Sequence, residues 1–157
     1  MKILFVASEM EPFARVGGIA DVIGTLPKRL AGLGCEVRVV IPYYRRVRAS
    51  LARLGLKPKT VSKELVFCID WLPVRGRIKE IELDGVHVDF LKNDELYGRK
   101  YVYSTPAGDY GDNDIRFGFL SLGALEIAKA LDFKPDIIHC HDWQPALLPI
   151  CLKWRKH

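Results

Sequence analysis

The sequence predicts an α/β protein, with a doubly wound, mostly parallel sheet and an inserted antiparallel hairpin. Short apolar runs, typical of strands buried on both faces, alternate with stretches of helical periodicity. Residues 62–93 differ, because apolar and polar residues alternate there around a turn at Asp84-Gly85, as in a hairpin. The 157 residues have the size of one domain, so residues 1–157 are treated as a single unit.

The first part of the chain predicts a crossover unit of a parallel sheet. Residues 2–8 (KILFVAS) form a nearly continuous apolar run, and residues 36–42 (EVRVVIP) form a second strand stopped by proline. Between them, residues 20–33 carry apolar side chains at spacings of three or four and end at Gly34, as expected of an amphipathic helix. Pro27 predicts a kink or a break in this helix, because proline removes a helical hydrogen bond. The order strand, helix, strand is typical of a parallel crossover.

Helix and strand signals return after the hairpin. Residues 93–111 are irregular, and a loop of this length in a compact domain is often functional. Residues 114–131 predict a helix with one apolar stripe, and residues 136–142 (DIIHCHD) predict another parallel strand. Residues 143–157 predict a last helix, whose apolar stripe contains Leu147, Ile150, Cys151 and Trp154.

Composition excludes several classes of protein. The apolar content of 49% supports a folded core. No apolar run approaches the ~20 residues of a membrane span, so no membrane partner is expected. Glu9 and Glu11 follow the short apolar N-terminus at once, which favours a buried strand over a signal peptide. The 4 cysteines are scattered without a C-x-x-C pair, which suits reduced thiols in a cytoplasmic protein.

Positive charge is concentrated in one segment. The net charge is +5, and no acidic residue occurs from Val37 to Lys63. This basic strip consists of Arg38, Arg45, Arg46, Arg48, Arg53, Lys57, Lys59 and Lys63. The strip suits the phosphates of a nucleotide or a nucleic acid, and the alternative is a solvated basic loop. Because only Tyr43 and Tyr44 are interleaved with the arginines, we rank nucleic-acid binding last and expect no nucleic-acid partner.

Two conspicuous loops fall at the carboxyl ends of predicted strands, where ligands collect in such sheets. The first contains Gly17 and Gly18 and leads into a helix, although neither G-x-G-x-x-G nor G-K-[ST] is present. Adjacent glycines let a ligand approach the backbone, and the helix start offers free amides and a positive dipole end. Arg15 adds a charge that can fork onto phosphate oxygens. The segment predicts an anion site, and the alternative is a tight turn with an exposed arginine.

The second loop follows the histidine pair of HCHDW. Strand alternation places His139 and His141 on one face and Cys140 on the other. Two histidines at a strand end can ligate a metal, as in many hydrolases, but further ligands are needed. The other histidines, His87 and His157, lie elsewhere in the chain, so we expect no metal.

The segment YGDNDIRF is the third candidate. Asp112 or Asn113 is a natural N-cap for the helix that follows, and this is the default interpretation. The same side chains beside Tyr110 suit hydrogen bonds to sugar hydroxyls, because carbohydrate sites combine planar polar groups with aromatic faces.

Three stretches together resemble one family. SEMEPFARVGGIADVIGTLP, YGDNDIRFGFLSLGALE and PDIIHCHDWQPALLP occur in this order in bacterial glycogen synthases and plant starch synthases, and the resemblance spans nearly all 157 residues. It implies a retaining glucosyltransferase of the glycosyltransferase-B architecture, with two Rossmann-like domains facing a cleft. It further implies transfer of glucose from ADP-glucose, or UDP-glucose, to the non-reducing end of an α-1,4-glucan, with no cofactor and no obligatory metal.

The resemblance also implies roles on the donor side. Gly17 and Gly18 match a Lys-x-Gly-Gly pattern whose amides and lysine approach the donor diphosphate. The lysine position holds Arg15, which keeps the charge but is bulkier and forked. Asp21 matches an acidic residue near the donor glucose.

His141 matches a histidine that lies beside the transferred glucosyl unit and helps to position it. Asp112 and Asn113 match an Asp-Asn pair near the acceptor. Family chains continue into a C-terminal domain that holds the donor base, and nothing here corresponds to it. We therefore expect an N-terminal, acceptor-side domain that does not catalyse transfer alone. The alternatives are a free-standing module that binds glucan or nucleotide without turnover and a metal-dependent hydrolase.

Overall fold

The computed structural model describes residues 1–61, 64–69 and 72–154, with the side chain of Trp154 excepted. One seven-stranded sheet has the order β3-β5-β6-β2-β1-β9, with β4 pairing β5 beside this path. The strands are β1 (Lys2–Val6), β2 (Glu36–Pro42), β3 (Lys59–Thr60), β4 (Leu65–Ile69), β5 (Leu72–Leu83), β6 (Val86–Lys92) and β9 (Ile137–Cys140). The adjacent strands β6, β2, β1 and β9 run parallel, whereas β3, β4 and β6 pair with β5 in antiparallel fashion. The predicted α/β fold with an inserted hairpin is confirmed.

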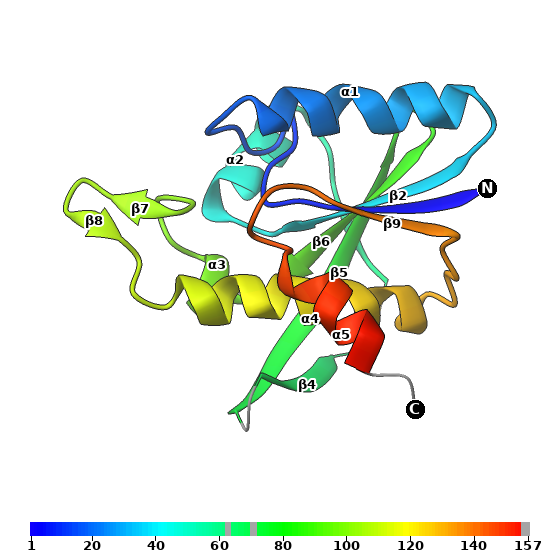
Figure 1. Ribbon diagram of the computed structural model, residues 1–157. Helices are drawn as coiled ribbons and strands as arrows, with labels where there is room; N and C mark the ends of the chain where they lie inside the picture. Colours follow the sequence, from blue (N-terminus) through cyan, green and yellow to red (C-terminus); the bar gives the residue numbers. More distant parts are fainter. Residues whose placement is uncertain (62–63, 70–71, 155–157) are drawn as a thin grey trace.

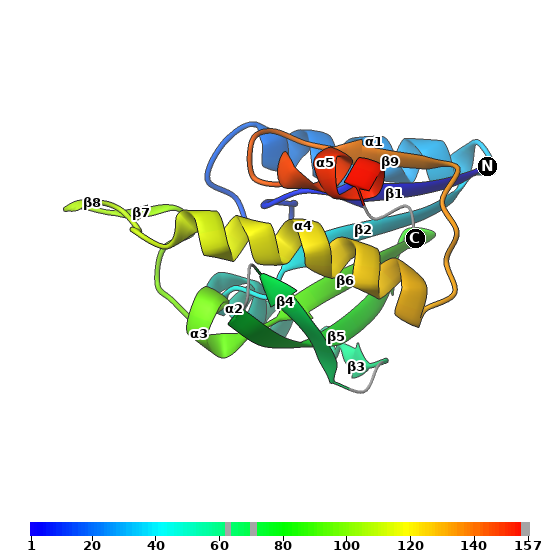
Figure 2. The same ribbon diagram turned by 60° about the horizontal axis from the view of Figure 1, so that its bottom comes forward.

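The sheet is covered on both faces, as the term doubly wound requires (Figures 1 and 2). Helix α1 (Ile19–Gly32) lies on one face, and α4 (Asn113–Ala130) and α5 (Leu147–Trp154) lie on the other. Two shorter helices, α2 (Arg45–Arg53) and α3 (Asp94–Tyr97), and the small hairpin of β7 (Ser104–Thr105) and β8 (Gly108–Asp109) complete the fold. They gather near the carboxyl ends of β1, β2 and β6, opposite the N-terminus of the chain (Figure 1).

Helix α1 shows how local sequence sets an element. It runs from Ile19 to Gly32 through a buried Pro27, so the expected break does not occur. Gly34 has φ of 87°, a left-handed conformation that glycine adopts at little cost, and it ends the helix. The Cys35 amide then bonds back to the Leu30 carbonyl at 3.1 Å.

Helix α4 is buried on nearly all sides, so the prediction of one apolar stripe is wrong. Its residues from Arg116 to Leu125 are buried without interruption. Phe119 stacks on Phe67 of β4 with ring centroids 4.9 Å apart, and a Cβ on Gly123 would lie 2.5 Å from a methyl carbon of Leu91. The sheet, β4 and α5 enclose the helix, and its small residues allow this close packing.

Some residues used in the sequence analysis are not described by the structure. Lys63 of the basic strip, the side chain of Trp154 and His157 lie outside the described residues. Within the described part of the chain, no helix combines the length and apolarity needed to cross a membrane.

Candidate functional site

The glycine loop connects β1 to α1 at the carboxyl edge of the sheet. Gly18 occupies the N-cap position of α1, and no side chain caps the helix there. The amides of Gly18 and Ile19 have no hydrogen-bond partner among the described residues. A Cβ on Gly18 would meet no atom within 4 Å, so the helix start is open to a ligand. Free amides at a helix N-terminus attract anions, so the geometry of this loop is compatible with the anion site that the sequence predicts.

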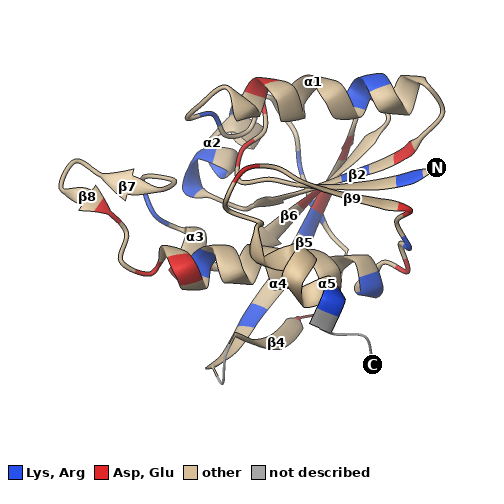
Figure 3. Ribbon diagram, viewed as in Figure 1, with Lys and Arg blue, Asp and Glu red and all other residues tan. Residues whose placement is uncertain are grey.

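Arg15 and Asp21, two of the predicted site residues, contact each other directly. An Nη2 proton of Arg15 is donated to Asp21 Oδ2 across 3.0 Å, and both side chains are more than half exposed. The main-chain oxygen of Arg15 accepts a hydrogen bond from Arg46 Nη1 at 2.5 Å. Arg46 belongs to the basic strip and lies on α2, whose basic residues flank the start of α1 (Figure 3). One residue of the strip therefore holds the glycine loop.

Part of the basic strip, namely Arg38, Arg48 and Lys59, forms ion pairs within the domain. Arg38 pairs with Glu80 and Asp89, each at 2.9 Å, and Arg48 pairs with Asp94. These partners lie on neighbouring strands or on α3, which the sequence alone could not bring together. Internal ion pairs therefore interrupt the strip at these positions.

His141 lies at the end of β9, beside the end of β1. Its amide bonds to the Val6 carbonyl at 3.0 Å, and its ring stacks on Phe5 with a centroid separation of 5.4 Å. The His139 ring lies 4.0 Å away, which confirms that the two histidines share a face. Burial, with a smaller contribution from His139, lowers the pKa of His141 to about 4, so the ring is neutral near pH 7. In the described part of the chain, no group of three metal-ligating side chains forms around it.

Asp112 and Asn113 both make structural contacts in the loop before α4. Asp112 occupies the N-cap position of α4 without a capping hydrogen bond, because both carboxylate oxygens accept hydrogen bonds from the Arg99 guanidinium. This pairing lowers the pKa of Asp112. Asn113 Nδ2 donates to the Tyr103 carbonyl at 3.0 Å, and Asn113 Oδ1 accepts from Arg116 Nη1 at 2.6 Å. The predicted N-cap position at Asp112 is therefore confirmed, although its side chain makes no capping hydrogen bond.

Three residues that sequence reasoning missed connect these parts of the site. Glu9 is buried, with 2% of its surface exposed, and Oε2 accepts hydrogen bonds from the amides of Val16 and Gly17. Its Oε1 accepts from the Tyr103 hydroxyl, which also lies 2.7 Å from Ser8 Oγ. The contact between Glu9 and Tyr103 joins residues 94 positions apart in the chain, so no local sequence pattern could predict it.

An exposed aromatic ring borders the same region. Trp143 is 53% exposed, and its ring lies 5.0 Å from Phe117 and 6.3 Å from Tyr103. A tryptophan with one open face can stack on the apolar face of a sugar ring. The predicted donor residues and the Asp112-Asn113 pair do not touch; Glu9 and Tyr103 lie between them.

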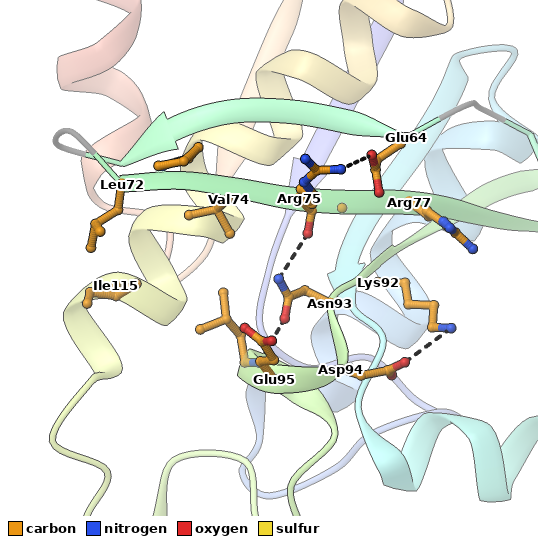
Figure 4. A pocket seen from close by; sticks show the side chains of 13 residues that line it. Glu64, Leu72, Val74, Arg75, Arg77, Lys92, Asn93, Asp94, Glu95 and Ile115 are labelled. Carbon is orange, nitrogen blue, oxygen red and sulfur yellow. Dashed lines mark hydrogen bonds and ion pairs between the residues drawn. The ribbon is translucent and has the colours of Figure 1, made fainter.

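A separate cavity of about 610 Å³ lies under the hairpin (Figure 4). Its wall includes residues of β5, the end of β6, α3 and Ile115 of α4. Asn93 donates to the Arg75 carbonyl at 2.9 Å, and Arg75 pairs with Glu64. None of the predicted site residues lines this cavity.

The doubly wound sheet, with the glycine loop and His141 at its carboxyl edge, defines a Rossmann-like α/β domain. The family model of the starch synthase catalytic domain matches residues 2–157, and the chain belongs to this family.

Several relatives are similar over almost the whole chain. Glycogen synthase of Geotalea daltonii is 44% identical over 156 residues, which cover 99% of this chain and 31% of the relative. Glycogen synthase 2 of Geobacter metallireducens is 43% identical, with coverage of 98% and 31%. The catalytic domain of starch synthase IV from Arabidopsis thaliana, solved with ADP and acarbose, is 27% identical with a TM-score of 0.79, covering 98% of this chain and 30% of that one. The chain thus spans about a third of the length of these relatives.

Proposed function

We propose that the chain is the N-terminal, acceptor-side domain of a retaining glucosyltransferase of glycogen synthesis. In this function, glucose passes from ADP-glucose to the non-reducing end of an α-1,4-glucan. Family membership and relatives called glycogen synthase support the reaction class. The ADP-bound starch synthase structure supports ADP-glucose over UDP-glucose as the donor. The 4 free cysteines support the predicted cytoplasmic location.

The observation that carries this proposal is the open helix start at Gly18 and Ile19, with Arg15 beside it. Transfer requires stabilisation of a departing nucleoside diphosphate, whose negative charge grows as the glycosidic bond breaks. Preorganised amides and a guanidinium aimed at this charge stabilise the transition state more than the ground state. Asp21, which shares the first turn of α1, lies near the donor glucose in this arrangement.

His141 positions the glucosyl unit and transfers no proton in this proposal. Its pKa of about 4 keeps the ring uncharged at neutral pH, and the contact with Phe5 fixes the ring plane. The main-chain carbonyl of His141 is a further acceptor for a sugar hydroxyl. Asp112 and Asn113 act on the acceptor side by fixing the loop around Tyr103, and Trp143 offers a stacking face.

The test uses protein expressed from the complete native reading frame. Labelled ADP-glucose or UDP-glucose is incubated with a short malto-oligosaccharide, and chain extension is measured. We expect extension with ADP-glucose, and no extension by the 157-residue chain alone, because this chain spans only about a third of the length of its relatives. The absence of extension with both donors would contradict the proposal.

Arg15 supplies the matched variants. We expect Arg15→Lys to retain transfer within about tenfold, because the charge is kept, and Arg15→Ala to lose about 10²-fold, as when one preorganised donor is removed. Arg53→Ala serves as a control, since this residue ends α2 away from the glycine loop. Equal activity of the Arg15→Ala variant and the unmodified protein would exclude a role for Arg15 at the diphosphate.

A further inference from the structure

A buried carboxylate, that of Glu9, contacts the backbone of the glycine loop. Glu9 is 2% exposed, and no lysine or arginine among the described residues pairs with it. Its partners are the amides of Val16 and Gly17 and the Tyr103 hydroxyl. A buried charge persists only where hydrogen bonds satisfy it, so these three donors hold the carboxylate in place.

These contacts fix the backbone of the loop from two sides. Glu9 holds the amides of residues 16 and 17, and Arg46 holds the carbonyl of residue 15. The amide of Gly17 is therefore already used inside the protein. The donors left for an external anion are the amides of Gly18 and Ile19 and the Arg15 side chain.

Glu9 also connects this loop to the sugar side of the site. The Tyr103 hydroxyl donates to Glu9, and the Tyr103 carbonyl accepts from Asn113 at the start of α4. Burial and the hydrogen bond to Glu9 raise the pKa of Tyr103, so its hydroxyl stays protonated and keeps donating. A displacement of Glu9 would therefore disturb both halves of the site, with the larger effect on the glycine loop that it contacts twice.

We propose that Glu9 is a positioning residue that presents the amides of Gly18 and Ile19, and not that of Gly17, to the donor diphosphate. The identity of the ligand rests on the proposed function, whereas the loop geometry does not. Glu9 does not touch the reacting atoms in this role. By holding the amides of Val16 and Gly17, Glu9 restricts rotation of the loop backbone. The amides of Gly18 and Ile19 are thereby kept in a fixed orientation before the ligand binds.

The first test measures amide hydrogen exchange in the ¹⁵N-labelled 157-residue chain. We expect the Val16 and Gly17 amides to be protected, and Glu9→Ala to accelerate their exchange by at least about tenfold, because their acceptor is lost. Glu9→Gln keeps an acceptor oxygen and should retain most of the protection. Glu82→Ala, an exposed change near the opposite end of the sheet, serves as the matched control. Fast exchange of both amides in the unmodified chain would overturn the proposal.

The second test measures transfer kinetics with protein from the complete reading frame. We expect Glu9→Ala to lower kcat/KM for the nucleotide-sugar by at least about tenfold while KM for the glucan changes less than about twofold, and Glu9→Gln to recover most of the loss. The positioning role would be overturned if KM for the glucan rose by the same factor as kcat/KM for the nucleotide-sugar fell. It would also be overturned if Glu9→Gln recovered none of the lost kcat/KM. If the unmodified protein transfers no glucose, the proposed function fails, and amide exchange still decides whether Glu9 positions the loop.

Discussion

His141 gives the sharpest prediction about acid stability. Its pKa falls from the ordinary 6.5 to about 4 in the folded protein, mainly because the ring is buried. The unfolded chain therefore binds a proton between pH 4 and 6.5 that the folded chain does not bind. Stability from this residue is fully present above pH 6.5 and is lost as the pH falls through this window. From the two pKa values, the loss between pH 8 and pH 5 is about 2 kcal/mol.

The assay compares urea unfolding of the unmodified chain and of His141→Gln at pH 8 and pH 5. The variant lacks the titrating ring, so its stability should fall by about 2 kcal/mol less than that of the unmodified chain. Asp89, whose pKa is raised to about 6 by burial, acts with the opposite sign, but it is present in both proteins and cancels in the comparison. Identical pH dependence in the two proteins, or an NMR titration that places His141 near pH 6.5, would refute the reasoning.

Two further predictions concern packing and buried charge. Arg38→Met should destabilise the fold by about 3–5 kcal/mol at pH 8, measured by urea unfolding, because the fully buried Asp89 loses its cation. At pH 5 Asp89 is mostly protonated, so the loss of stability should be smaller there. An equal loss at both pH values would contradict this prediction. Gly123→Ala should cost about 1–3 kcal/mol in the same assay, because the new methyl would clash with Leu91, whereas Gly32→Ala, with open space at its Cβ, should be neutral or stabilising. Equal effects of the two glycine changes would contradict the packing argument.

The sequence was sufficient for elements whose periodicity is local. The apolar runs of β1 and β2 and the spacing in α1 predicted the crossover because each pattern is complete within a few residues. Helix α2 was missed because only Val47 and Leu51 are buried among its basic residues, so the segment resembled a loop. Helix α4 was only partly understood, because its second buried face depends on β4 and α5 closing over it.

The candidate site divides in the same way. The placement of Gly17, Gly18 and His141 at one edge of the sheet could be predicted, because strand ends in a parallel sheet meet there wherever they fall in the chain. Glu9 could not be predicted, since a carboxylate after an apolar run usually marks the surface. Its burial depends on amides of its own loop and on a tyrosine from a distant segment, and such a combination exists only after the chain has folded.

The arginine that replaces the family lysine has a specific consequence in this geometry. Arg15 Nη2 pairs with Asp21 at 3.0 Å and its Nε lies 3.9 Å from Glu11 Oε1, yet the guanidinium has five N–H donors and the side chain is 59% exposed. An exposed pair of this kind contributes at most about 1 kcal/mol, so it does not prevent a multiply charged diphosphate from binding. A lysine ammonium is a compact point charge, so the carboxylate and the phosphate would compete for the same group. The planar guanidinium of Arg15 can instead donate to Asp21 from one nitrogen and to a phosphate oxygen from another. In the function proposed above, Arg15 therefore allows Asp21 and the guanidinium to remain in contact while a diphosphate binds.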